Sequence, residues 1–238
     1  MIRQFILTLI IALISLASLK GQNALLATER FPELRYQYLK GAVEYNNYMQ
    51  IKGQAFLTSD WTLGTIYLKN GYVVHDVKLK LDRYAHRLIV YQENLKRVLD
   101  VDKYLIDEFT CSIDGQEKRF RLIDDLGTKA RAENGSFLEV LQAGEISFFR
   151  LYYCDVIPLQ EREGVFLDEF VPESVFYLYD KGSFSRIRLS RRVILKLYPE
   201  HTQALKQYMR KEHIHPKIEE DFAKAVGYLN SLLTSGNQ

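Results

Sequence analysis

The chain has 238 residues, a formal net charge of +2 and two cysteines. This length fits one large domain, or one domain with an appendage. Two cysteines without clustered histidines exclude a zinc-binding signature.

Residues 1–21 have the composition of a secretory signal peptide. Arg3 supplies a short positive region, residues 5–16 are apolar, and the small residues Ala17 and Gly21 suit cleavage. The apolar run is too short for a comfortable membrane span. We therefore expect export to the periplasm or cell envelope, with an uncleaved N-terminal anchor as the alternative.

Charge is distributed unevenly along the rest of the chain. Residues 22–180 hold 19 Lys and Arg against 25 Asp and Glu, whereas residues 181–238 hold 11 against 5. A basic tail of this kind either docks on the acidic body or faces an anionic partner.

After an irregular, tyrosine-rich lead-in at 22–52, the stretch Gly53–Glu93 predicts three or four antiparallel strands in sequence order. Its clearest part is a hairpin at Asn70-Gly71, because Asn-Gly tolerates positive φ at both positions of a two-residue type I′ turn. Apolar and charged residues alternate from Val77 to Asp82, which places the apolar side chains on one sheet face.

More strand-like runs follow, separated by turn signals such as Asp114-Gly115. These runs lie at 96–101, 103–113, 117–124, 135–142 and 145–156. Residues 158–173 are charged and bounded by prolines, so we expect a loop over the surface. Residues 175–190 then predict a further hairpin.

The periodicity becomes helical after Ser190, a suitable N-cap. Pro199 and Pro216 each precede a helical pattern, as proline does at a first helical position. The last pattern has one apolar stripe, formed by Ile218, Phe222, Val226, Leu229 and Leu233. The predicted fold is mainly β (α+β): about ten antiparallel strands in a meander sheet, open barrel or sandwich over 22–189, followed by two or three helices over 190–238 that pack on it.

Two further features have alternative interpretations. Cys111 and Cys154 lie in strand-like runs, so in an exported chain they could form a disulfide, or else remain as two buried free thiols. Trp61, the single tryptophan, lies in a turn segment. It is either a platform for a ligand or a cap on the end of the β core.

Two patches also resemble a known family. The run I-x-G-x-A-F-L-x-x-D-W-x-x-G-T-I-Y-L-x-x-G (51–71), followed by D-V-K-L-K-L-D-x-Y (76–84), is similar to a family of uncharacterised secreted proteins of Bacteroidetes. The ending D-F-A-K-A-V-G-Y-L-N (221–230) resembles theirs too. The resemblance implies an envelope location and implies no activity.

Signatures of catalysis are missing from the sequence. It contains no phosphate-binding loop, dinucleotide fingerprint, nucleophile elbow or zinc-protease helix. His213 and His215 could share a metal ion, although a polar loop between helices is the simpler interpretation. His75 and Asp76 are neighbours in a strand, so they should point to opposite faces. We expect no enzyme, cofactor or metal.

The basic tail suggests a binding role instead. The leading candidates are Arg191, Arg192 and Lys196, within a set that also contains Arg186, Arg188, Lys206, Arg210 and Lys211. Export argues against nucleic acid as the partner, so we expect an envelope protein, a lipid or a glycan. Charges in the middle of the strand-like runs argue against an integral membrane barrel. The hypothesis is a non-catalytic envelope protein with a binding or scaffold role, and the alternative is a lipid- or glycan-binding β protein with an aromatic-lined pocket.

Overall fold

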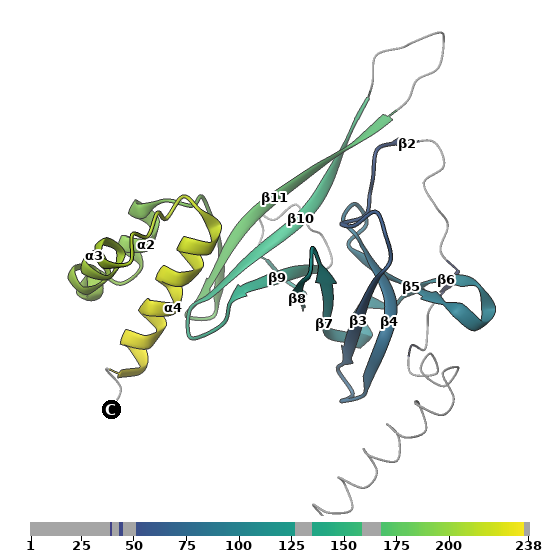
Figure 1. Ribbon diagram of the computed structural model, residues 1–238, viewed down its shortest axis with the longest axis horizontal. Helices are drawn as coiled ribbons and strands as arrows, with labels where there is room; N and C mark the ends of the chain where they lie inside the picture. Colours follow the sequence, from purple (N-terminus) through teal and green to yellow (C-terminus); the bar gives the residue numbers. More distant parts are fainter. Residues whose placement is uncertain (1–38, 40–42, 45–50, 127–134, 159–167, 236–238) are drawn as a thin grey trace, which may run out of the picture.

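The computed structural model describes residues 39, 43–44, 51–126, 135–158 and 168–235. Figure 1 shows a curved sheet with three helices gathered beside one end of it. The strands are β1 (Val43–Glu44), β2 (Ile51–Lys52), β3 (Thr62–Leu68), β4 (Val73–Asp82), β5 (Arg87–Gln92), β6 (Arg97–Val101), β7 (Ile106–Ile113), β8 (Gln116–Ile123), β9 (Ser136–Gln142), β10 (Ser147–Pro158), β11 (Asp168–Asp180) and β12 (Ser183–Ile187). The helices are α2 (Arg191–Leu197), α3 (Thr202–Lys211) and α4 (Glu219–Ser235), with short 3₁₀ turns at Glu93–Leu95, Lys103–Leu105 and Pro199–His201.

The described strands form one open sheet in the order β1-β6-β5-β4-β3-β7-β8-β9-β10-β11-β12. Neighbours in this order are antiparallel, and β2 adds a short parallel pair with β11. The predicted β-rich fold with C-terminal helices is therefore confirmed, as a single mixed sheet. From β3 to β12 the meander has one interruption, because β7 pairs with β3 and not with β6, the strand before it in sequence. The short strands β1 and β2 also pair out of sequence order, with β6 and β11.

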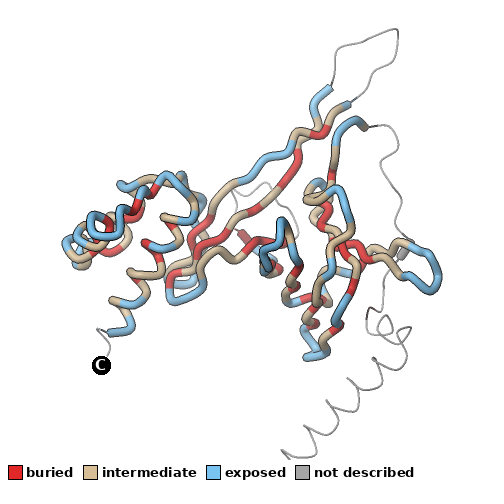
Figure 2. The backbone as a smooth tube through the Cα atoms, in the orientation of Figure 1, coloured by how far each residue is buried: buried red, intermediate tan, exposed pale blue. Residues whose placement is uncertain are grey.

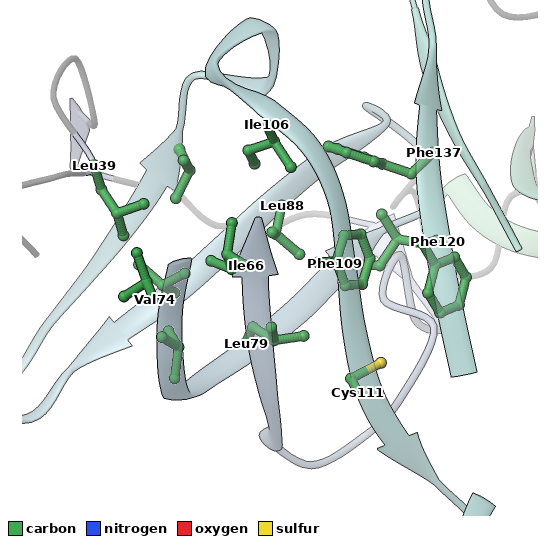
Figure 3. Close-up of a cluster of buried hydrophobic side chains, with 14 of the residues drawn as sticks. Leu39, Ile66, Val74, Leu79, Leu88, Ile106, Phe109, Cys111, Phe120 and Phe137 are labelled. Carbon is green, nitrogen blue, oxygen red and sulfur yellow. The ribbon is translucent and has the colours of Figure 1, made fainter. Parts of the chain in front are cut away.

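The larger core lies inside the curve of strands β3 to β9. Figure 3 shows side chains from these strands meeting in one apolar cluster, including Ile66, Leu79 and Leu88. Phe109 stacks on Phe120 with ring centroids 4.8 Å apart, and Phe137 meets Phe109 edge-on at 5.2 Å. These three rings belong to β7, β8 and β9, so they join the later strands to the core of the first hairpin.

A second core joins the helices to β10 and β11. Phe148 of β10 lies 4.9 Å from Phe222 of α4, measured between ring centroids. Asn230 of α4 accepts a hydrogen bond from the Ile146 N–H and donates one to the Ile146 carbonyl, both at 2.8 Å. Burial of apolar side chains and these two bonds therefore fix α4 against the sheet.

The Asn70-Gly71 turn differs from the prediction. The Gly71 N–H donates to the Leu68 carbonyl, and the Leu68 N–H donates to the Tyr72 carbonyl, each at 2.9 Å. Gly71 has a φ of 86°, whereas Asn70 is not among the residues with positive φ. The loop is thus a three-residue one, a type I turn followed by a left-handed glycine, and the two-residue type I′ prediction is wrong.

A β-bulge interrupts β4 two residues after its start. Gly64 pairs with Val77 and Ile66 with Val74, so His75 and Asp76 together lie opposite Thr65. Asp76 has a φ of 52°, and both bulge residues are exposed. The expectation that these two side chains point to opposite faces is therefore wrong.

The bulge also explains the core pattern of β4. Val74 and Val77 are both buried although they are three positions apart, because the extra residue shifts the alternation by one. From Val77 onward, the predicted alternation holds through Leu79 and Leu81.

Part of the predicted surface loop at 158–173 is strand. β11 begins at Asp168 and pairs with β10 at every residue from there to Tyr179. Pro172 lies inside this strand, opposite Cys154. Residues 159–167 lie outside the described part of the chain, as do residues 1–21 and their predicted signal peptide.

The helical segment begins as expected. Ser190 caps α2, with its side chain accepting a hydrogen bond from the Val193 N–H at 3.3 Å. Phe222, Val226 and Leu229 are buried on α4, but Ile218 is 52% exposed because α4 begins only at Glu219. No helix in the described part of the chain is long and apolar enough to cross a membrane.

Gly64 provides a test of how closely the strands approach one another. A Cβ atom at Gly64 would collide with the Thr110 carbonyl of β7 and lie 2.8 Å from Leu79 Cδ2. We predict that Gly64→Ala lowers the free energy of unfolding by about 3 kcal/mol, as expected for overpacking against rigid backbone.

Gly182→Ala is the matched control for the Gly64 variant. Gly182 has open space around it but a φ of 80°, so its loss should cost about 1 kcal/mol. Urea denaturation of both variants measures the difference, and equal costs would contradict the close approach at Gly64.

Candidate functional site

An open cleft lies where the sheet meets the helical segment. Its volume is about 630 Å³, and its walls come from β11, the end of β12 with the residues after it, and the turn before α4. The residues that line it, which together we call the cationic cleft, are Ser174, Val175, Phe176, Arg186, Ile187, Arg188, Leu189 and Lys217.

The charges of the cationic cleft have one sign. Arg186, Arg188 and Lys217 are exposed, and within the described residues no carboxylate lies at ion-pair distance from any of them. Ile218, beside Lys217, is exposed as well. Cations around half-buried apolar side chains suit a partner that carries both anionic and apolar groups.

The lining residues carry little catalytic potential. Ser174 is the single hydroxyl among them, and no lining residue is a histidine, cysteine, aspartate or glutamate. A nucleophilic serine needs a base within hydrogen-bond reach. The lining residues offer a ligand positive charge and apolar contact.

The predicted basic-tail residues lie elsewhere on the helical segment. Arg191, Arg192 and Lys196 are exposed on α2, whose buried face carries Ile194. None of the three lines the cationic cleft. The structure thus separates the cations of the basic tail, with some in the cleft, some on α2 and others on α3.

Trp61 packs within the protein at the start of β3. Its ring lies 5.6 Å from that of Tyr91, and the Lys80 ammonium lies 5.2 Å above it. Lys80 also donates to the Ser59 carbonyl, and burial lowers the pKa of this lysine more than the charge of Asp60 raises it. These contacts fit the interpretation of Trp61 as a cap on the sheet.

The backbone of the interhelical loop, which carries His213 and His215, is tied to α4. The His215 N–H donates to the Asp221 carboxylate at 2.8 Å, which ties the loop to the first turn of α4. His213 has a φ of 51° and lies in the turn after α3. Among the described residues, no group of three or more His, Cys, Asp or Glu side chains could hold a metal ion.

A buried ionic network borders the cationic cleft, and no pattern in the sequence predicted it. Glu139 of β9, only 4% exposed, accepts hydrogen bonds from Lys118 at 2.8 Å, Arg150 at 2.6 Å and Tyr152 at 2.8 Å. Arg150 also donates to Glu219 of α4 at 2.6 Å. We call these five residues the Glu139 network. It joins β8, β9 and β10 to the first turn of α4.

The pKa values of the two carboxyl groups in the network are shifted in opposite directions. Burial would raise the pKa of Glu139, but hydrogen bonds from Lys118 and the charge of Arg150 outweigh burial and lower it. Burial raises the pKa of Glu219 in spite of Arg150. The charged form is thus favoured at Glu139 and disfavoured at Glu219.

We predict that Glu139→Gln lowers the free energy of unfolding by about 3 kcal/mol at pH 7, because it leaves Lys118 and Arg150 partly buried without their carboxylate. Because the pKa of Glu139 is lower in the folded protein, its charged carboxylate stabilises the fold at pH values above its usual pKa of 4.5. This stabilisation is lost as the pH falls through the folded pKa. The difference between wild type and variant should therefore shrink in acid.

Glu219→Gln is the matched control, measured by urea denaturation across pH 3 to 7. Since its folded pKa is raised, Glu219 contributes less at pH 7, and its replacement should cost less there. Equal costs at both positions, or a cost of Glu139→Gln that stays constant with pH, would contradict this assignment.

The cysteines are free thiols. Cys111 lies in β7 and Cys154 in β10, with β8 and β9 between these strands, so a disulfide between neighbouring strands is not formed. They are 4% and 7% exposed, respectively. Burial raises the pKa of Cys111 to about 11 and also raises the pKa of Cys154.

We predict that neither thiol reacts appreciably with Ellman's reagent in the native protein, because the thiolate is the reactive form. Both should react after unfolding in urea without a reductant, and Cys111→Ser and Cys154→Ser should each remove one reactive group. An unfolded, unreduced wild type without reactive thiols would reveal a disulfide instead.

The sequence pointed to Arg186 and Arg188 as parts of a basic tail, but not to Lys217 or Ser174 beside them. Lys217 was missed because it follows Pro216 at a predicted helix start, where a lysine does not indicate a binding site. Ser174 was missed because its strand was predicted to begin at Val175, whereas β11 begins at Asp168.

Comparison with known proteins adds no relative: no family model, curated protein or solved structure matches this chain. The resemblance to secreted proteins of Bacteroidetes therefore stays a prediction.

Proposed function

We propose that this chain is a non-catalytic binding protein of the cell envelope, and that the cationic cleft holds an anionic partner. The observation that carries the proposal is the grouping of Arg186, Arg188 and Lys217 around apolar walls. Cations that line one cleft create a positive potential there, which attracts an anionic partner.

The ion pair between the sheet and the helices supports a partner from outside the chain, because its positive charge lies on the sheet. If the basic tail served to dock on the acidic body, lysines and arginines of the tail would pair with carboxylates of the sheet. Among the described residues, the ion pair that joins the two has the opposite sense, with Arg150 on β10 and Glu219 on α4. The cations of the cationic cleft therefore stay available for another molecule.

A small ligand with an anionic head and an apolar body is the alternative occupant. Phe176 is the one aromatic residue among those that line the cationic cleft, and the other apolar residues are aliphatic. Stacking of a sugar ring on aromatic faces is thus less favoured than contact with a lipid chain. The alternative that this cleft supports is a lipid, and not a glycan.

Export is the remaining part of the proposal. It rests on the composition of residues 1–21, and an anionic partner outside the cytoplasm is a protein or a lipid headgroup more readily than nucleic acid.

Two triple variants with the same change in charge test the proposal. The cleft variant is Arg186→Glu, Arg188→Glu and Lys217→Glu, and the α2 variant is Arg191→Glu, Arg192→Glu and Lys196→Glu. The probes are a fluorescent peptide of alternating Glu and Val, its Lys and Val counterpart, and vesicles with or without phosphatidylglycerol.

We predict that the protein binds the Glu and Val peptide, the vesicles with phosphatidylglycerol, or both. It should bind neither the Lys and Val peptide nor the vesicles without phosphatidylglycerol. The cleft variant should lose about tenfold to a hundredfold in affinity, as expected for the loss of three exposed attractive charges, and the α2 variant should bind nearly normally. Loss in the α2 variant alone would assign binding to the basic tail on α2. Absence of binding to every anionic probe would contradict the proposed function.

A further inference from the structure

The two edges of β11 are paired to different extents. One edge pairs with β10 along the strand, from Asp168 to Tyr179. The other pairs with β2 at Asp168 and Glu169 and with β12 from Phe176 to Asp180. Between these two contacts, on the edge that faces away from β10, no described strand pairs with residues 170–175.

This open edge is exposed and adjoins the cationic cleft. Pro172, Glu173 and Ser174 are exposed, visible as the pale stretch in the middle of β11 in Figure 2. Ser174 and Val175 line the cleft. An unpaired strand edge presents backbone N–H and C=O groups that another extended chain can bind.

The register shows which backbone groups face outward. Asp180 and Ser183 are paired across a two-residue turn, and such flanking residues exchange hydrogen bonds. Along β11, the backbone N–H and C=O groups of every second residue then face β12, namely those of Asp180, Leu178 and Phe176. Continued without a register shift, the alternation directs the N–H and C=O of Ser174 to the open edge.

Pro172 fits the same alternation. It lies two residues before Ser174, so its nitrogen also faces the open edge, and its lack of an N–H costs no hydrogen bond to β10. Proline thus blocks one end of the open edge, which leaves Ser174 as the residue with both a donor and an acceptor directed into the cleft.

We infer that the cationic cleft binds an extended acidic peptide segment of a partner protein, which adds to β11 as a short strand opposite Ser174. This inference rests on the proposed function and names its ligand class. The backbone of the peptide pairs with Ser174, and its acidic side chains reach Arg186, Arg188 and Lys217 around the edge. Its apolar side chains contact Phe176 and Leu189.

A peptide fits these groups better than a lipid does. A lipid chain over the open edge would cover the Ser174 N–H and C=O without bonding to them, and burying unpaired polar groups is costly. A peptide backbone supplies both an acceptor and a donor at the spacing of a strand. Alternation along the peptide also allows acidic and apolar groups to reach different walls of the cleft.

Ser174→Pro and Ser174→Ala separate the backbone from the side chain. Proline removes the outward N–H, whereas alanine keeps it and removes only the hydroxyl. Glu173 is extended by its pairing with Tyr153, so it accepts a following proline. With the Glu and Val peptide as probe, Ser174→Pro should weaken binding about tenfold and Ser174→Ala should leave it within twofold. Equal binding by the two variants would overturn the inference.

N-methylated peptides test the same point in the unmodified protein, in case Ser174→Pro does not fold. One probe is methylated at its odd backbone nitrogens and the other at its even ones, so each has one blocked edge. Strand addition predicts that one of the two loses binding at least tenfold while the other binds as the parent peptide does.

These outcomes are distinguishable from failure of the proposed function. If both methylated peptides bind like the parent, and the cleft variant still loses affinity for it, strand addition is wrong and charge-based binding stands. If phosphatidylglycerol vesicles bind to the cleft and the peptide does not, the ligand is a lipid and the inference is wrong. If no anionic probe binds, both proposals fail.

Discussion

The pairing of β10 with β11 over 12 residues is the constraint on which the rest of the structure depends. β10 is shared by several parts of the protein. Its Phe148 packs under α4, its Leu151 lies in the cluster on the opposite face, and its Cys154 packs against Phe170 and Ala55. A change in the β10–β11 register by one residue would send these side chains to the wrong faces.

The same pairing produces the candidate site through a mismatch in strand lengths. β11 has 13 residues and β12 has 5, so β12 covers only the last part of the outer edge of β11. The chain leaves the sheet after Ile187 and enters α2 at Arg191. The uncovered edge and the cations that follow β12 therefore lie in one place.

The Glu139 network places the third cation of the cationic cleft. Arg150 on β10 holds Glu219 in the first turn of α4, and Lys217 lies two residues before Glu219. Tyr152, another member of the network, lies directly opposite Ser174 across the β10–β11 pair. The network thus connects the stability of the helical segment to the geometry of the cleft.

Local patterns in the sequence predicted much of the fold. The alternation from Val77 to Leu81, the cap at Ser190 and the strand-like runs were sufficient, because each depends on residues close in sequence. The pairing of β7 with β3, the bulge at Asp76 and the extent of β11 were not predicted. They depend on contacts between distant segments, as when Gly64 lets β7 approach closely.

The candidate site was only partly predictable for the same reason. A charge count identifies a basic tail, but it cannot tell which cations gather around a strand edge and which lie on a helix face. Arg188 and Arg191 differ by three positions, and the structure places one in the cleft and the other on α2. The separation follows from the end of β12, which no local pattern determines.

Amide hydrogen exchange of β11 measures the central claim most directly. The free protein should show rapid exchange at the Ser174 N–H, which faces the open edge, and slow exchange at the Glu173 and Val175 N–H groups, which face β10. Addition of the Glu and Val peptide should protect Ser174 and leave its two neighbours unchanged. A Ser174 amide that is protected before the peptide is added, or that still exchanges rapidly at saturating peptide, would contradict the account.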